Sequence, residues 1–180
     1  DFLQTEHIRV EHFHGLLKIF LYDRSKSVDV PGGDFHFGLF LVRMVNLLHT
    51  PILLNSMKTS LIQITNQNHT SPAIVAKNCT SFAQNFRGLM FEKDLPENGG
   101  ILLDEHAESK VNTSIHMLFM NFDITAVWID SKQRVVDVKL AKKWGLAYFP
   151  KSPARYVLEI SSQHLNDFHE GDQLEFVHVS

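Results

Sequence analysis

Short apolar runs set between turn signals are the feature that most constrains how this chain folds. From residue 57 onward, Val, Ile, Leu, Phe and Met gather in brief segments, and clusters of Asn, Ser, Pro, Asp or Gly separate them. Parallel strands need long crossover connections, usually helical, whereas segments this short suit strands joined by tight turns. The pattern therefore predicts a mainly β fold: a small barrel or sandwich of short strands with two short helices.

The expected strands follow from apolar periodicity. They lie at residues 61–65, 73–76, 114–120, 124–129, 136–140, 156–160 and 174–177. The first two are separated by a turn-rich stretch and predict a hairpin. The third and fourth are apolar on both sides, so we expect them to form the centre of the core. In the fifth, Asp137 and Lys139 alternate with apolar residues, which predicts that both side chains face water.

Two short helices complete the expected fold. Ser81 can cap the first, Phe82 and Phe86 share one of its faces, and Gly88 suits its left-handed end. The second carries Leu165 and stops before the glycine that follows it. Each helix is short enough to pack on the sheet as a minor element.

Residues 1–56 show neither sustained helical nor strand periodicity. We interpret Met57 as a natural start, residues 57–180 as the domain, and residues 1–56 as an N-terminal extension that is poorly ordered or non-native. An apolar stretch inside that extension approaches membrane-spanning length, but Arg43 and Pro51 interrupt it, so we expect no span. We expect a cytoplasmic location, with export or membrane attachment left open.

Composition excludes several classes of function. Seventeen basic against twenty acidic residues give a net charge of -3, without the basic excess that binding a phosphate backbone requires, so we expect no nucleic-acid partner. Cys79 is the one cysteine, which excludes an intrachain disulfide or a thiolate cluster, and we interpret it as a small buried thiol. The eleven histidines follow no recognised ligand spacing, so we predict neither a metal nor a cofactor. We expect a monomer.

An ordered set of short motifs carries a family resemblance. The motifs are Arg87-Gly88-Leu89-Met90-Phe91, Gly99-Gly100-Ile101-Leu102, Val127-Trp128-Ile129-Asp130, Tyr156-Val157-Leu158-Glu159-Ile160 and Gly171-Asp172. Because these motifs occur in the order typical of that family, the chain resembles the domain of unknown function 192 family from about residue 57 to 180. The resemblance implies a small, mostly β domain of bacteria and archaea without an established activity. Thr125 stands where many members have an acidic residue, which puts in doubt any site that uses that acid.

Four residues are candidates for a ligand-binding site: Arg87, His116, Arg155 and Glu159. The Arg87 guanidinium could grip a carboxylate or phosphate, or it could serve only to pair with carbonyls at a helix end. His116 lies in an apolar run and could act as a base, or be a satisfied core histidine. Glu159 could pair with Arg87 or Arg155, or face solvent.

Three functions remain open. The leading hypothesis is a binding or accessory module for a small anionic ligand or a partner's peptide. The alternative is a hydrolase or isomerase in which His116 and Glu159 act as acid and base and Arg87 binds an anion, although the sequence holds no recognisable catalytic motif. A purely structural or protein-interaction domain is the third.

Overall fold

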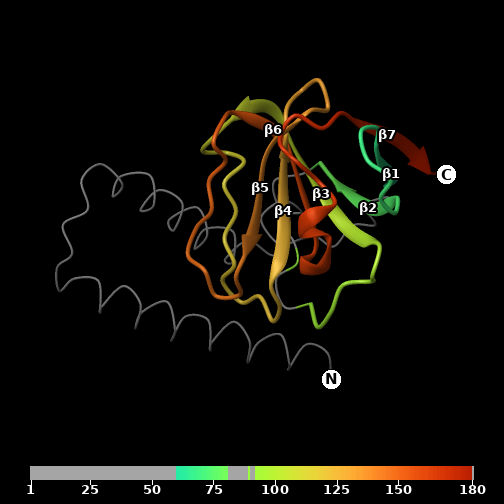
Figure 1. The fold of residues 1–180 in the computed structure, drawn as a ribbon. Helices are drawn as coiled ribbons and strands as arrows, with labels where there is room; N and C mark the ends of the chain where they lie inside the picture. Colours follow the sequence, from blue (N-terminus) through green and yellow to red (C-terminus); the bar gives the residue numbers. More distant parts are fainter. Residues whose placement is uncertain (1–59, 81–88, 90–91, 180) are drawn as a thin grey trace, which may run out of the picture. The chain divides into compact units, whose positions relative to one another are not determined.

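The computed structural model describes residues 60–80, 89 and 92–179, and within them a single seven-stranded sheet forms the fold (Figure 1). The strands are β1 Ser60–Asn66, β2 Ile74–Cys79, β3 Gly99–Ser109, β4 Ile124–Ile129, β5 Val135–Ala141, β6 Ala154–Ser161 and β7 Leu174–Val179. Their order across the sheet is β5-β4-β6-β3-β2-β1-β7. The predicted mainly β class is confirmed.

Helical structure is minor in the described part of the chain. The 3-10 turn η1, Ser162–Asn166, is the element found where we expected the second short helix. The expected first helix, near residues 81–88, lies outside the described residues, as do the proposed extension 1–56 and its apolar stretch. No helix within the described residues is long and apolar enough to cross a membrane.

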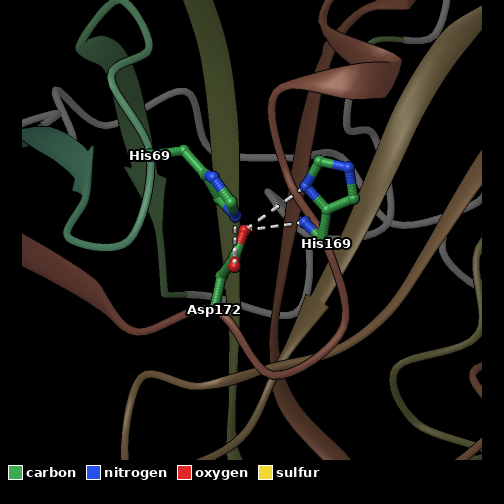
Figure 2. A group of neighbouring side chains, drawn as sticks. All are labelled: His69, His169 and Asp172. Atoms are coloured by element: carbon green, nitrogen blue, oxygen red, sulfur yellow. Dashed lines mark hydrogen bonds and ion pairs between the residues drawn. The ribbon is translucent and has the colours of Figure 1, made fainter.

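All neighbouring strands are antiparallel except β2 and β3, which run parallel. The predicted hairpin of β1 and β2 is confirmed, with Ile64 opposite Ile74. The edge strands β5 and β7 approach at one end, where Arg134 and Gln173 form an isolated bridge. The sheet is therefore curled but open. The turn after β1 reaches the same end and brings His69 against Asp172, at 3.1 Å between Nε2 and Oδ1 (Figure 2).

Both faces of the sheet are covered at its centre. All six residues of β4 are buried, and alternate side chains enter two separate apolar clusters. Val127 and Ile129 join the cluster that is built with β1, β2 and β7, whereas Ala126 and Trp128 join the other. The second cluster is closed by side chains from outside the sheet: Leu89, Ile115, Met117, Met120 and Tyr148.

The prediction of a strand at 114–120 is wrong. This stretch is an irregular segment, tied to the rest by the bridge between Ile115 and Tyr148 and by the Met117 N–H donating to the Gly145 carbonyl at 3.0 Å. Ile115, Met117 and Met120 are buried because the segment covers one face of the sheet, and periodicity alone cannot distinguish such a segment from a buried strand.

The longest strand, β3, was not among the predicted ones. It begins with two glycines and ends in the polar stretch 104–109, so its apolar signal covers only a small part of its 11 residues. Its pairing with β6 shifts register between Asp104 and Ser109. The strand is held by its neighbours on both sides, and this support depends on residues far away in the sequence.

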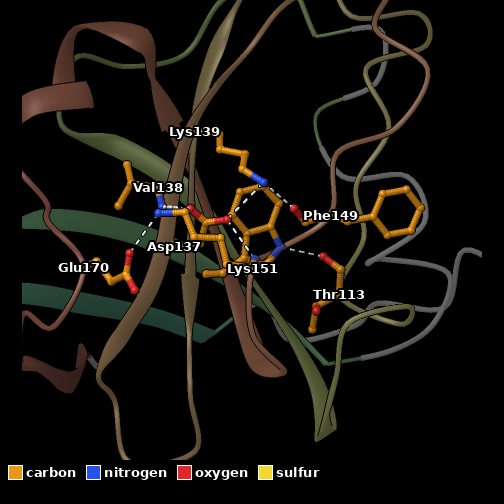
Figure 3. A network of polar contacts seen from close by, with 8 residues as sticks. Thr113, Asp137, Val138, Lys139, Phe149, Lys151 and Glu170 are labelled. Atoms are coloured by element: carbon orange, nitrogen blue, oxygen red, sulfur yellow. Dashed lines mark hydrogen bonds and ion pairs between the residues drawn. The ribbon is translucent and has the colours of Figure 1, made fainter.

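The prediction that Asp137 faces water is also wrong. Asp137 is 1% exposed, because residues 142–151 fold back over β5. Its carboxylate accepts the backbone N–H groups of Lys151 at 2.9 Å and Val138 at 3.0 Å, and it pairs with the Lys139 ammonium at 3.0 Å (Figure 3). Lys139 also lies over the ring of Trp128, 5.6 Å from its centroid. A buried charge is thus fully compensated.

We predict that Trp128→Phe destabilises the domain. The indole N–H donates to the carbonyl of Thr113 at 2.7 Å, so the substitution leaves that buried carbonyl without its donor and opens a cavity. We expect the free energy of unfolding to fall by roughly 2–4 kcal/mol in urea titrations followed by circular dichroism. Trp144→Phe, at a side chain that is 54% exposed, is the control and should change stability by less than about 0.5 kcal/mol. Equal effects of the two substitutions would contradict this account of Trp128.

Candidate functional site

The Glu159 carboxyl lies at the centre of the sheet. In β6 the alternation of side chains places Glu159 on the same face as Val157. Its neighbours across the sheet are Ile101 of β3 and Ala126 of β4, both buried and apolar. Glu159 itself is 6% exposed. The structure therefore excludes the alternative in which the Glu159 side chain faces solvent.

This carboxyl is buried without compensation from the described residues. Within that part of the chain, no hydrogen bond or ion pair reaches the Glu159 side chain, whereas Asp137 accepts several. Burial raises the pKa of Glu159 from its ordinary 4.5 to about 7. A buried group with a strongly shifted pKa and no partner among the described residues is a candidate for function, because its burial lowers the stability of the fold.

Two side chains of β2 share the face with Glu159. Lys77 lies opposite Ile101, which puts it in the same row as Glu159 at two strand spacings, roughly 10 Å away. Its side chain is exposed. Cys79, two residues further along, has its pKa raised to about 11 by burial and by the charge of Glu159. The thiol therefore stays protonated and is a poor nucleophile, although Cys79 is half-buried and not fully buried as predicted.

His116 lies in the irregular segment that covers this face. Burial lowers the pKa of His116 to about 4, so its imidazole is neutral near pH 7 and a weak base. No hydrogen bond joins His116 to Glu159 among the described contacts. The acid–base pair that the enzyme hypothesis requires is thus not formed directly, and that hypothesis stays a prediction.

Arg155 is engaged elsewhere. Its Nε and Nη2 bind the two oxygens of Asp104 at 3.0 and 3.1 Å, and its guanidinium lies 4.8 Å from the ring centroid of Tyr156. Burial tends to raise the pKa of Asp104, but the hydrogen bonds from Arg155 and the His106 backbone hold it below its ordinary value. Along β6, Arg155 is four residues from Glu159, roughly 13 Å. The structure therefore does not bring these two candidates together.

Of the other residues that the sequence analysis singled out, Thr125 is placed by the structure and Arg87 is not described. Arg87 lies outside the described residues. Thr125 is fully buried opposite Ile160, and its hydroxyl donates to the Ser162 carbonyl at 3.4 Å, so it belongs to the face away from Glu159. Lys77 was not among the predicted site residues. The alternation of β2 gives its face, but only the register of β3 and β6 relates it to Glu159.

Comparison with known proteins gives a family but no activity. The family model DUF192, with the description "Uncharacterized ACR, COG1430", matches residues 62–176. The UPF0127 protein TK1120 of Thermococcus kodakarensis is 48% identical over 79 residues, which are 44% of this chain and 48% of the relative. A UPF0127 protein of Thermococcus gammatolerans is 40% identical over 98 residues, 53% of this chain and 62% of the relative. The chain thus spans about half the length of the curated relatives it matches.

Two solved structures share the fold. A putative transcription regulator from Sinorhizobium meliloti 1021 superposes with a TM-score of 0.60 at 17% identity, covering 68% of this chain and 96% of that one. A protein of unknown function from Novosphingobium aromaticivorans gives a TM-score of 0.54 at 19% identity, covering 64% and 83%. At these identities the likeness concerns the fold alone.

We predict that Glu159 makes stability depend on pH. Because its pKa is higher in the folded state, about 7 against 4.5, the folded domain holds the proton more tightly and loses stability as pH rises from about 4.5 through 7. Between pH 5 and pH 8 the wild-type protein should lose roughly 2–3 kcal/mol relative to Glu159→Gln, measured by urea unfolding at each pH. The exposed Glu92→Gln is the control and should keep the wild-type pH dependence. Parallel pH curves for wild type and Glu159→Gln would remove Glu159 from this account.

Proposed function

The chain belongs to the uncharacterised DUF192 family, and on that premise we propose that its domain is a binding module whose site is centred on the buried Glu159 carboxyl. The ligand has an apolar body and an acidic group, and is either a small organic acid or the acidic end of a partner's peptide. The single observation that carries this proposal is the burial of Glu159 without a described partner.

The energetics support a role beyond folding. Above pH 7, holding this carboxylate in an apolar environment costs the folded state roughly 3 kcal/mol relative to the unfolded chain. A leucine or methionine at the same place would avoid that cost and add apolar burial. A ligand that accepts a hydrogen bond from the protonated Glu159 carboxyl satisfies this buried group only when it is bound, whereas Asp137 is paired with Lys139 in the folded chain itself.

The surroundings of Glu159 favour a ligand with an apolar body. The side chains next to it across the sheet are Ile101 and Ala126. Beyond Lys77, the same row continues into Leu61 and Val179, which are 38% and 40% exposed. The row thus has partly exposed apolar side chains on the far side of Lys77 and buried apolar side chains next to the carboxyl.

The polar groups favour an acidic head. Near pH 7 about half of the Glu159 carboxyls carry a proton, and a protonated carboxyl donates a hydrogen bond to a carboxylate. The Lys77 ammonium supplies the positive charge on the solvent side of the site. Arg155, another of the predicted ligand-binding residues, has its charge paired with Asp104, so the proposal assigns the positive charge of the site to Lys77.

An enzyme remains the second candidate function. The observation in its favour is that a carboxyl with a pKa of about 7 is suited to act as general acid or base at neutral pH. A hydrolase or isomerase would require His116 to reach Glu159 directly or through one water when substrate binds. Turnover of a substrate that is lost in both His116→Ala and Glu159→Gln would favour it over the binding module.

We predict that acidic ligands bind more weakly as pH rises. Two probes distinguish the sources of the acid: 4-phenylbutyrate, and a Leu-Phe dipeptide with a free or an amidated C-terminus. Because the protonated carboxyl is the binding form, affinity measured by isothermal titration calorimetry should fall about tenfold between pH 6 and pH 8. In Glu159→Gln this pH dependence should vanish, and Glu159→Leu should abolish binding.

Two further variants make the test specific. Lys77→Met should weaken binding at both pH values, and the exposed Glu92→Gln should behave as wild type. The proposal is wrong if neither probe binds, or if Glu159→Leu binds as tightly as wild type while its unfolding curve shows that it is folded.

A further inference from the structure

A second cluster of polar side chains lies away from the Glu159 face, at the end of the sheet where two turns meet. His69 comes from the turn between β1 and β2, and His169 and Asp172 come from the turn between η1 and β7. One donor atom from each of the three lies within 4.8 Å of the others. Figure 2 shows both imidazole rings directed toward the carboxylate, with His69 Nε2 at 3.1 Å from Oδ1 and His169 Nδ1 at 3.9 Å from Oδ2.

The two turns are held together by amide side chains. The Asn66 amide donates to Asp172 Oδ2 at 2.8 Å and to the Asp167 carbonyl at 3.0 Å. The Asn68 side-chain oxygen accepts the backbone N–H of Gln173 at 2.7 Å. These bonds fix the spacing between the turns without using the imidazoles, so His69 is placed near Asp172 independently of its own contact.

The Asp172 carboxylate is oriented as a ligand. Asp172 is 5% exposed, and its Oδ2 accepts two N–H groups, from the Asn66 amide and from the backbone of His169 at 2.7 Å. Gly171, at φ +96°, makes the turn that brings Asp172 back to this position. Oδ1 faces His69 instead. One carboxylate oxygen is thus held by N–H donors and the other faces the His69 imidazole, and hydrogen bonds of this kind orient metal-binding carboxylates.

We propose that His69, His169 and Asp172 form a binding site for a divalent transition-metal ion, with Zn²⁺ as the reference ion. Two imidazole nitrogens and one carboxylate oxygen are the ligand set of open zinc sites, in which water or a ligand takes the fourth position. The same borderline ligands also accept Co²⁺ and Ni²⁺. The site is separate from Glu159 and does not depend on the binding function proposed for that residue.

The distances require only a modest adjustment. Zn–N and Zn–O bonds of about 2.0–2.2 Å place tetrahedral donors roughly 3.4 Å apart, so the widest of the present separations must shorten by about 1.4 Å. The side chains of His69 and His169 are 50% and 59% exposed, which leaves them free to rotate toward an ion. Asp172, the buried member, need not move.

The test is metal titration of the full chain after removal of any affinity tag. We expect bound Co²⁺ to give visible d–d absorption, which is lost when Zn²⁺ displaces the Co²⁺. Zn²⁺ binding itself is measured by isothermal titration calorimetry. His69→Ala and His169→Ala should each weaken Zn²⁺ binding by at least about tenfold, since even outer hydrogen-bond partners of a metal site contribute that much. His178→Ala, at an exposed residue of β7, is the matched control and should leave the affinity unchanged.

The chain carries other histidines, so the site is identified by the difference between these variants rather than by binding alone. His169→Gln keeps a polar side chain of similar size and replaces His169→Ala if the alanine variant lowers the melting temperature. Glu159→Gln should bind Zn²⁺ as wild type does, which separates this site from the one on the sheet face. Unchanged Zn²⁺ affinity in the His69 and His169 variants, or absence of Co²⁺ absorption in the wild-type protein, would overturn the proposal.

Discussion

The fold depends on a strand that exposes no side chain. Because all of β4 is buried, the sheet must be covered on both faces, yet η1 is the one helical element among the described residues. On one face the cover comes from the curled β1, β2 and β7; on the other it comes from irregular segments. These segments can be buried because specific bonds pin them to the sheet: Trp128 donates to Thr113, and Asp137 accepts the backbone of Lys151. Irregular backbone over a core is stable only where such bonds satisfy its polar groups.

The buried carboxyl groups of Asp137 and Glu159 show that burial alone does not determine whether an acidic residue has a structural role. Asp137 of β5 and Glu159 of β6 are both almost inaccessible, on strands that are separated in the sheet by β4. The first has N–H donors and an ammonium around it and so holds the chain together; the second has apolar neighbours and a pKa of about 7. The difference lies in the partners: a carboxylate whose charge is paired in the folded state has a structural role, whereas one without a partner among the described residues is a candidate for ligand binding.

Much of the sheet could be predicted from the sequence, because strands such as β1, β4 and β6 carry their apolar residues in compact runs. The segment 114–120 could not be distinguished from a strand, since Ile115, Met117 and Met120 are buried in the same cluster as residues of β4. The surroundings of Glu159 and the cluster around Asp172 could not be predicted from the sequence in the same way. That Glu159 is buried, and that Arg155 pairs with Asp104 rather than with Glu159, depends on strand register. The approach of His69 to Asp172 depends on two turns about a hundred residues apart meeting in space, which no local spacing encodes.

The pairing of β1 with β7 has a consequence for how the domain is made. The first strand of the sheet, β1, lies between its near neighbour in sequence, β2, and β7, which comes last of the seven strands along the chain. Until β7 leaves the ribosome, β1 presents an unpaired edge, and the curled sheet cannot draw its two ends together through Arg134 and Gln173. The sheet of this domain is therefore completed only once β7 is available, and β1 has an exposed edge that can pair with other strands during that interval.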